Sequence, residues 1–175
     1  AGPIGCMHLE LARARGASRL VLVDINASRL AVARERFNPD LAVDSSEGGY
    51  AATVMDFTQG RGAGVVIVAA ASAAAQESAI NLAGKMGRVC FFAGLPKQNP
   101  YMKLDANVLH YKQVRVFGAF SSTPAHNRMA LDFLSRGDVH ATSYITRTLP
   151  LARIQEGFEA VERGAELKVV IDPQR

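Results

Sequence analysis

The start of the chain combines a glycine-containing turn, an amphipathic helix and an apolar strand that ends in a carboxylate. Residues 1–26 read AGPIGCMHLELARARGASRLVLVDIN. The glycines at 2 and 5 match the second and third glycines of a G-x-G-x-x-G pattern, and Asp24 follows about 20 residues later. Glycines let the backbone approach a diphosphate, and a helix N-terminus favours negative charge. The pattern therefore predicts the middle of a βαβ unit that holds a dinucleotide, with a cofactor loop formed by Gly2, Pro3, Ile4 and Gly5.

The dinucleotide pattern is incomplete at its beginning. Its first glycine, and the strand that normally carries it, would precede Ala1, and the sequence has no initiator Met. We therefore expect a fragment whose sheet lacks its first strand. The two neighbours of that strand would then be left unpaired, which predicts poor folding of the chain alone because unpaired buried backbone groups are costly.

Asp24 also bears on the choice of cofactor. A carboxylate accepts hydrogen bonds from both ribose hydroxyls and repels a 2′-phosphate, so the sequence favours NAD over NADP. Arg29 lies five residues further on. Two interpretations of Arg29 stay open: a guanidinium that stacks on adenine, or a solvated helix residue.

Short apolar runs alternate with helical patterns along the rest of the chain. We expect strands over residues 20–23, 41–43, 65–69, 88–92, 114–117, 144–149 and 167–171, with the runs at 20–23, 65–69 and 88–92 buried. We expect helices over residues 3–15, 27–37, 49–59, 73–83, 124–135 and 151–163, and a helical turn over 104–109. This alternation predicts an α/β fold with a doubly wound parallel sheet.

Several local signals fix details of these helices. Ile4, Met7, His8 and Leu11 recur at helical spacing and predict the core-facing stripe of the first helix. We expect glycines at 16, 84 and 137 to end helices. Either Asn26 or Ser28 caps the second helix, and Thr123 followed by proline predicts a cap and first residue of a later one.

Two loops follow strand ends and are further candidates for the cofactor site. In an open parallel sheet, ligands lie beyond the carboxyl ends of the strands. The two loops therefore offer backbone groups to the second half of a dinucleotide; their residues are Ala93, Gly94, Leu95, Ala119, Phe120 and Ser121. For Phe120, core packing and cofactor contact are both open.

Composition excludes several other classes of protein. The net charge is +4, but basic and acidic residues are interleaved without a basic run, which argues against nucleic acid as a partner. No apolar run approaches the length of a membrane span. Cys6 and Cys90 are interpreted as small apolar residues in a reducing cytoplasm, and the four histidines as structural rather than metal-binding.

The ordered set of segments resembles the coenzyme half of the zinc-dependent medium-chain alcohol dehydrogenases, in particular the sorbitol (L-iditol) and threonine dehydrogenase branch. The segments that carry the resemblance are AGPIG, VLVDINASRLAVAR, GAGVVIVAAAS, GKMGRVCFFAGLP, NVLHYKQVRVFGAFSSTP and LKVVIDP. The resemblance implies hydride transfer between a polyol or secondary alcohol and NAD, with a catalytic zinc. It also implies that Ile4 flanks the pyrophosphate, and that the 93–95 and 119–121 loops flank the nicotinamide.

The same resemblance implies what this chain lacks. The zinc ligands of the family lie in an N-terminal domain that precedes these segments, so we expect no catalytic or metal-binding residue here and no activity of the chain alone. Residues 1–140 would form the NAD-binding domain and residues 141–175 a segment that returns to the catalytic domain. Relatives are dimers or tetramers, which implies a homo-oligomer.

Two other functions stay open at this point. One is a non-catalytic NAD-binding module or a degraded gene product. The other is a zinc-free reductase of the same superfamily; such enzymes often prefer NADP, and Asp24 argues against that preference.

Overall fold

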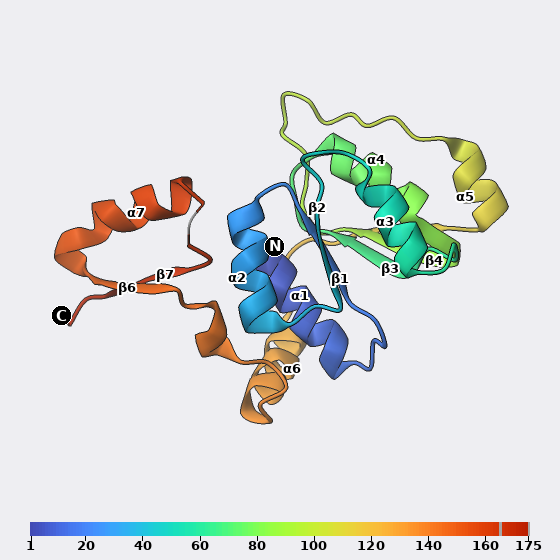
Figure 1. Cartoon of the computed structure of the whole chain (residues 1–175). Helices are drawn as coiled ribbons and strands as arrows, with labels where there is room; N and C mark the ends of the chain where they lie inside the picture. The colour runs from blue at the N-terminus through green and yellow to red at the C-terminus, as the bar shows by residue number, and fades with distance from the viewer. Residues whose placement is uncertain (165, 175) are drawn as a thin grey trace. The chain divides into compact units, whose positions relative to one another are not determined.

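The structure, a computed structural model, describes residues 1–164 and 166–174. The chain forms two compact units: Ala1–Ser46 together with Thr123–Arg175, and Glu47–Ser122. Each unit is described by itself. Figure 1 shows the course of the chain and the labels of its elements.

The first unit begins with two helices and two parallel strands. Its elements are α1 (Pro3–Ala14), β1 (Val21–Asp24), α2 (Ala27–Phe37) and β2 (Leu41–Asp44). β1 and β2 pair in parallel, with Asp24 opposite Asp44 at their carboxyl ends. The core between α1, α2 and β1 contains the buried side chains of Cys6, Leu22 and Phe37.

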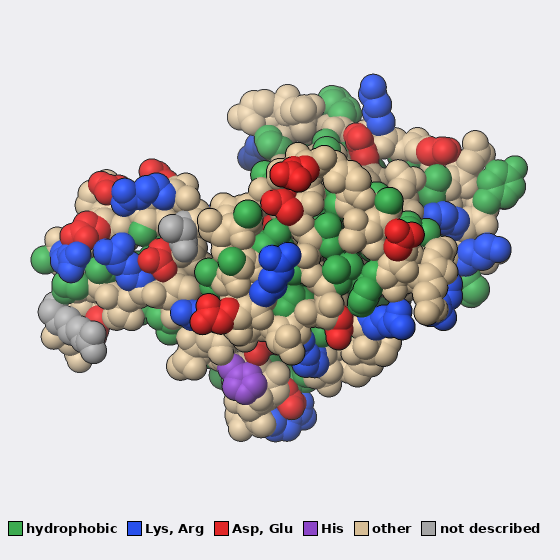
Figure 2. All heavy atoms as spheres, viewed as in Figure 1, with side chains coloured by type: hydrophobic (Ala, Val, Ile, Leu, Met, Phe, Trp, Pro, Cys, Tyr) green, Lys and Arg blue, Asp and Glu red, His purple; other side chains and the backbone are tan. Residues whose placement is uncertain are grey.

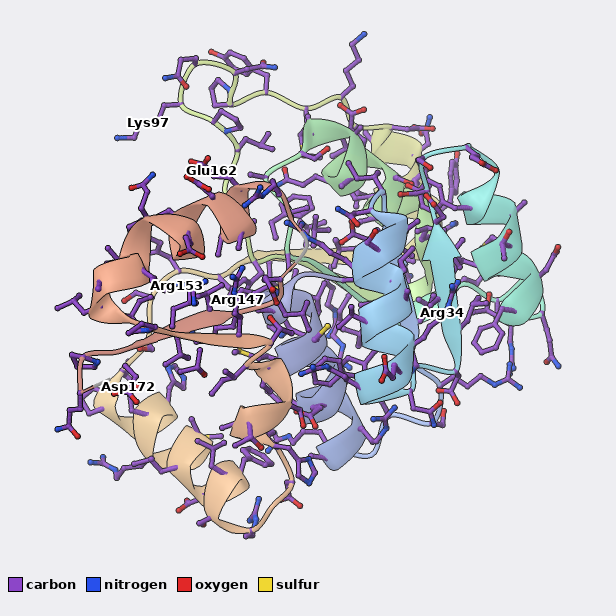
Figure 3. All side chains as sticks on the ribbon, turned by 60° about the vertical axis from the view of Figure 1, so that its left-hand side comes forward. Arg34, Lys97, Arg147, Arg153, Glu162 and Asp172 are labelled. Carbon is purple, nitrogen blue, oxygen red and sulfur yellow. The ribbon has the colours of Figure 1, made fainter. Side chains whose placement is uncertain are left out.

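The first unit continues after the second with α6 (Pro124–Ser135), η1 (Ala141–Tyr144), β6 (Arg147–Pro150), η2 (Leu151–Arg153), α7 (Ile154–Glu162) and β7 (Val169–Asp172). β6 and β7 pair in parallel, and α7 connects them. Acidic and basic side chains are interleaved over α7, as Figure 2 shows. Arg153, labelled in Figure 3, forms two hydrogen bonds of 2.6 Å with Glu156, and Arg147 lies 3.5 Å from the same carboxylate.

The second unit contains a three-stranded parallel sheet of order β3-β4-β5. Its elements are α3 (Tyr50–Phe57), β3 (Ala63–Val68), α4 (Ala73–Leu82), β4 (Ala83–Phe91), α5 (Ala106–Lys112) and β5 (Arg115–Gly118). Val68 and Val89 pack against Ala79 and Ile80 of α4 in the core of this unit.

These elements confirm the predicted α/β fold. All the strand pairs are parallel, and helices lie between successive strands in the chain. A doubly wound sheet has the strand order 3-2-1-4-5-6. When strand 1 is left out, strands 3-2 remain on one side and strands 4-5-6 on the other. These two orders match β2-β1 and β3-β4-β5 of this chain. Within the described residues, β1 and β3 each have one paired neighbour, as expected for a sheet without its first strand.

Most of the predicted helix boundaries are confirmed. Asn26, rather than Ser28, caps α2: its side chain accepts a hydrogen bond of 2.9 Å from the Arg29 N–H. Gly16 follows α1 with a φ of +85°, and Gly137 follows α6 with a φ of +73°. Thr123 caps α6 and exchanges hydrogen bonds with His126 in a capping box.

The predicted core stripe of α1 is confirmed only in part, because Met7 packs against the core of the first unit. Ile4 and Leu11 are exposed, whereas Cys6, Leu9 and Glu10 are buried. The buried face includes Glu10, whose hydrogen-bonding partners lie in a distant part of the chain, and the spacing of apolar residues along α1 does not reveal them.

Two of the three strands predicted to be buried, β3 and β4, are covered on one face. In β3 and β4, Val68 and Val89 are buried, but Val65, Ile67 and Arg88 are exposed. The reason is that α4 and α5 contribute to one core cluster with the face that carries Val68 and Val89. Alternation in burial is the pattern of a sheet with one covered face.

The boundaries of two further strands also differ from expectation. β4 starts at Ala83 instead of residue 88, because Ala83 pairs with Ala63 and Gly84 allows a close approach to Arg61. Gly84 therefore does not simply end a helix. The strand expected from Tyr144 begins only at Arg147, because Tyr144 belongs to the 3-10 turn η1 and is buried.

Within residues 1–164 and 166–174, no helix is both long and apolar enough to cross a membrane.

Candidate functional site

The N-terminus of α1 presents uncapped backbone groups. Gly2 is the N-cap residue, has an extended backbone (φ −72°, ψ 174°) and offers no side chain to the first turn. Pro3 follows at the first helical position, where its missing N–H costs nothing. The first-turn N–H groups have no partner within a helix, and no atom lies within 4 Å of where a Gly2 Cβ would be. This helix end can therefore accept an anion.

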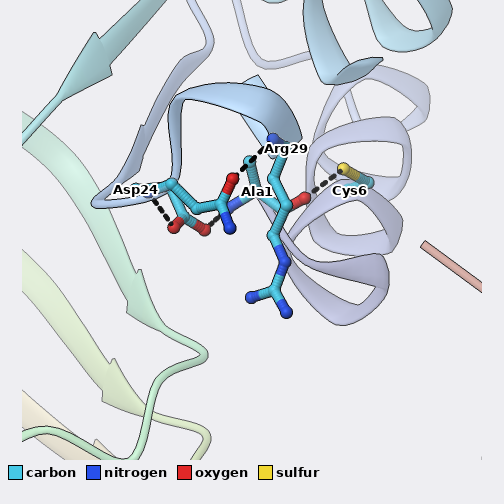
Figure 4. A network of polar contacts seen from close by, with 5 residues as sticks. Ala1, Cys6, Asp24 and Arg29 are labelled. Carbon is cyan, nitrogen blue, oxygen red and sulfur yellow. Dashed lines mark hydrogen bonds and ion pairs between the residues drawn. The ribbon is translucent and has the colours of Figure 1, made fainter. Parts of the chain in front are cut away.

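Asp24 lies beside this helix end. Its carboxylate forms an ion pair with the amino group of Ala1, one residue before Gly2, and accepts a hydrogen bond of 2.9 Å from the Asn26 N–H (Figure 4). The side chain is 16% exposed. The carboxylate thus points toward the start of the glycine-containing turn.

Arg29 is not fully solvated. The side chain is half-buried, and a Cβ added to Gly164 would lie 3.1 Å from its Nη2. Its Nε is buried without a hydrogen-bond partner among the described residues. The interpretation of Arg29 as a solvated helix residue is therefore wrong, and a contact with adenine remains a prediction.

Gly5 and Cys6 hold α1 against the unit's core. A Cβ added to Gly5 would lie 3.9 Å from Leu22 of β1, so this glycine faces the strand. Cys6 is fully buried, as expected for a small apolar residue, and burial raises its pKa to about 11. Its Sγ lies 3.6 Å from the carbonyl oxygen of Ala1.

In the second unit, the two candidate loops follow neighbouring parallel strands, β4 and β5, and therefore leave the sheet at the same edge. The Ala93 N–H donates to the Val68 carbonyl at 3.1 Å, and the Ala119 N–H donates to the Phe91 carbonyl at 3.2 Å. Gly94 is exposed and Leu95 half-buried. The backbone of both loops is thus anchored where it leaves the sheet.

Phe120 and Ser121 lie in the loop after β5. Phe120 is fully exposed, so the interpretation of Phe120 as a core residue is wrong. Ser121 has a φ of +61°, a conformation that few residues other than glycine adopt. Strain of this kind is concentrated at functional loops.

Glu10, Tyr144 and His140 form a cluster that the sequence did not predict; Glu10 and Tyr144 are buried, and His140 is exposed. The Tyr144 hydroxyl donates a hydrogen bond to Glu10 Oε2. The backbone N–H of His140 donates to the same oxygen at 3.3 Å. The His140 Nδ1 lies 3.1 Å from Glu10 Oε1. Burial is the main reason why the pKa of Tyr144 is raised, and the neighbouring Glu10 raises it further. No local signal could have revealed the cluster because Glu10 lies 130 residues from His140 and 134 from Tyr144.

The other histidines have structural surroundings. His110 packs edge-on against Tyr111, with ring centroids 4.8 Å apart, and His126 belongs to the cap of α6. Burial lowers the pKa of His8. Within residues 1–164 and 166–174, no three His, Cys, Asp or Glu side chains are grouped so that they could hold a metal ion.

Parallel strands joined by helices place the chain in the α/β class. The profile of the zinc-binding dehydrogenase family matches residues 3–136, and the chain belongs to this family. The resemblance to zinc-dependent dehydrogenases inferred from the sequence is thereby confirmed.

Individual dehydrogenases are similar to the chain over nearly its whole length. The chain is 29% identical to a D-arabitol-phosphate dehydrogenase of Enterococcus avium over 98% of its own length and 48% of the relative. It is 27% identical to a sorbitol dehydrogenase of Halalkalibacterium halodurans, over 98% of this chain and 50% of the relative. A solved zinc-binding dehydrogenase from Sinorhizobium meliloti, bound to NADP, is 26% identical and superposes with a TM-score of 0.83 over 98% of this chain and 50% of that one. The chain thus spans about half the length of the curated relatives it matches.

Proposed function

We propose that this chain is the NAD-binding part of a zinc-type dehydrogenase that oxidises a polyol or secondary alcohol. The observation that carries the proposal is the position of the Asp24 carboxylate beside the uncapped N-terminus of α1. Family membership supports the reaction class, and the polyol dehydrogenases among the relatives support the substrate class.

The first unit suits the adenosine diphosphate half of a dinucleotide. The first-turn N–H groups of α1 would bind the pyrophosphate, with Gly2, Pro3, Ile4 and Gly5 forming its loop. Asp24 would accept hydrogen bonds from the ribose hydroxyls, and Arg29 would contact the adenine. The chemistry of these groups fits the cofactor.

A carboxylate at position 24 favours NAD over NADP, because it would lie against the 2′-phosphate of NADP. The relative from Sinorhizobium meliloti was solved with NADP, so membership in the family does not decide the cofactor. The preference has to come from residues of this chain, and Asp24 is the residue we assign to it.

The second unit would contact the nicotinamide half through the loops 93–95 and 119–121. We further propose that residues 1–140 make up the NAD-binding domain and that residues 141–175 belong with the catalytic domain. Nicotinamide, when bound, supplies a hydride acceptor. Because the described residues offer no group of metal ligands, they do not fit the family's zinc, and we derive no step through it.

Titration calorimetry with NAD and NADP tests this function on the 175-residue chain. We expect binding of NAD with an affinity at least tenfold higher than that of NADP. Equal or tighter binding of NADP would refute the role of Asp24. Absence of binding to both cofactors, by a chain that circular dichroism shows to be folded, would refute the function as a whole.

A non-catalytic NAD-binding module remains the alternative, because the chain spans about half the length of its relatives. An intact-mass measurement on the protein from its natural source, combined with an assay of NAD reduction by sorbitol, separates the two. A longer polypeptide that reduces NAD supports the enzyme, and a 175-residue product that binds NAD without turnover supports the module. A homo-oligomer in the cytoplasm, with a small alcohol as its substrate, completes the proposal.

A further inference from the structure

Gln76 is a buried polar residue on α4 with a specific partner. It is 4% exposed and, with Glu10, is one of two buried polar or charged residues in the described part of the chain. Its Nε2 donates a hydrogen bond of 3.0 Å to the carbonyl oxygen of Ala93, in the loop after β4. Burying the amide without a hydrogen bond would cost free energy, because the amide would lose its bonds to water and gain none in return. The hydrogen bond to Ala93 therefore stabilises the buried position of Gln76.

The helix that carries Gln76 is held at both ends. The Ser72 hydroxyl accepts a hydrogen bond of 3.3 Å from the Ala75 N–H at the start of α4. At the other end, Lys112 Nζ donates to the carbonyls of Asn81 at 2.9 Å and Ala83 at 3.1 Å. Ile80, one turn after Gln76, is 1% exposed. α4 is therefore capped at its start and bonded to Lys112 at its end, and the Gln76 amide reaches the loop from between these points.

The hydrogen bonds of Ala93 orient the peptide that follows it. The Ala93 C=O accepts from Gln76, and this bond orients the Ala93–Gly94 peptide, while the Ala93 N–H, in the preceding peptide, donates to Val68. In a trans peptide the N–H of Gly94 points opposite to the Ala93 carbonyl, away from Gln76. Gly94 is exposed, and no atom lies within 4 Å of where its Cβ would be. The Gly94 N–H therefore lies in an exposed loop, on the side of the peptide opposite to Gln76.

We propose that Gln76 is a positioning residue for the nicotinamide half of the coenzyme. It acts through the Ala93–Gly94 peptide, whose N–H it directs at the ligand, and it does not touch the ligand itself. This inference rests on the proposed function, because it takes the 93–95 loop as part of the nicotinamide site. It adds a residue outside the predicted site. This residue would affect the binding of the nicotinamide half of the dinucleotide and leave the binding of the adenosine half unchanged.

The test compares two ligands on the 175-residue chain and its Gln76→Met variant. Met keeps the length and approximate volume of the side chain and removes the amide. ADP-ribose probes the adenosine half alone, by calorimetry, and NADH probes both halves, by calorimetry and by the fluorescence of its bound nicotinamide. We expect NADH to bind about fivefold more weakly, the effect of one lost hydrogen bond, with reduced nicotinamide fluorescence. ADP-ribose should bind within twofold of the original chain.

Gln155→Met is the matched control, because it makes the same chemical change at an exposed position of α7. Its affinities for both ligands should be unchanged. Gly94→Pro is a second variant, which removes the oriented N–H in an exposed loop without altering the core. It should reproduce the selective loss of NADH affinity even if Gln76→Met fails to fold, while Gly94→Ala, which keeps the N–H, should retain that affinity.

Each outcome bears on the proposal. Unchanged NADH affinity and fluorescence in Gln76→Met would overturn it, and so would an equal loss for NADH and ADP-ribose, which indicates a merely structural role. A selective loss in Gly94→Ala as large as in Gly94→Pro would overturn the assignment of the N–H. If the original chain binds neither ligand, the proposed function itself fails, which is a different result from a failure confined to the Gln76 variant.

Discussion

The phenol of Tyr144 donates a hydrogen bond to the carboxylate of Glu10, 134 residues earlier in the chain. Both side chains are buried, and the ring of Tyr144 packs against Phe37 at a centroid distance of 4.9 Å. This contact fastens the turn η1 to helices α1 and α2. It also explains why α1 buries a glutamate on the face that meets the core.

Replacing Tyr144 with Phe tests the strength of this link. The change removes only the phenol oxygen and leaves the Glu10 carboxylate with one hydrogen-bond donor fewer. We expect the free energy of unfolding to fall by about 1 to 3 kcal/mol, the cost of an unsatisfied buried polar group. Urea denaturation measures it, and Tyr111→Phe, at a residue 75% exposed, is the control. Equal stability of the two variants would contradict the role of the Glu10 contact.

Asp24 is the residue on which the cofactor preference depends. Asp24→Ala should weaken NAD binding by about 1 to 3 kcal/mol, the range of hydrogen bonds to charged groups. Asp44→Ala is a matched control, because Asp44 lies opposite Asp24 at the same end of the paired strand. Calorimetry on both variants should show the loss only at position 24. A loss of the same size at Asp44 would show that the effect is not specific to the predicted ribose site.

The cap of α2 gives a prediction that separates two neighbouring candidates. The Asn26 side chain accepts the Arg29 N–H, so Asn26→Ala should destabilise the protein by about 1 kcal/mol. Ser28 lies inside the helix, and Ser28→Ala should change stability little or increase it slightly. Thermal denaturation of the two variants checks this order; the reverse order would mean that the cap is at Ser28.

Burial of Cys6 makes stability depend on alkaline pH. The folded state holds the thiol proton up to a pKa of about 11, whereas the ordinary pKa of a cysteine thiol is 9.0, so between these values the unfolded state binds fewer protons. Stability should therefore fall as pH rises from about 9 to 11. Urea titrations across this range, on the original chain and on Cys6→Ala, measure the contribution. Parallel curves for the two proteins would rule out Cys6 as its source.

Gly84 lies where no side chain fits. A Cβ at this position would be 2.3 Å from the Arg61 carbonyl oxygen, which belongs to the backbone and cannot turn aside. Gly84→Ala should destabilise the protein by about 1 to 3 kcal/mol through the forced shift of the backbone. Gly64→Ala is the control, since no atom lies within 4 Å of its Cβ position. Chemical denaturation of both variants should show the loss at Gly84 alone.

Much of the secondary structure follows from signals that act within a few residues. The caps at Asn26 and Thr123 and the helix ends at Gly16 and Gly137 were predicted, because each depends on hydrogen bonds or a φ value within one helical turn. The parallel α/β arrangement was predicted from the alternation of apolar runs and helices. The exact start of β4 was not, because it depends on pairing with Ala63, twenty residues away.

The sequence by itself determined the order of the elements, the α/β class and the placement of a carboxylate at the end of β1, since these follow from spacing along one chain. Only the tertiary structure decided which faces are buried. Glu10 is in the core because Tyr144 and His140 reach it, Phe120 is outside because nothing packs on it among the described residues, and Gln76 is fixed by the carbonyl of Ala93. Burial is a property of partners that meet in space, and the local pattern of a segment carries no record of which distant residues those partners are.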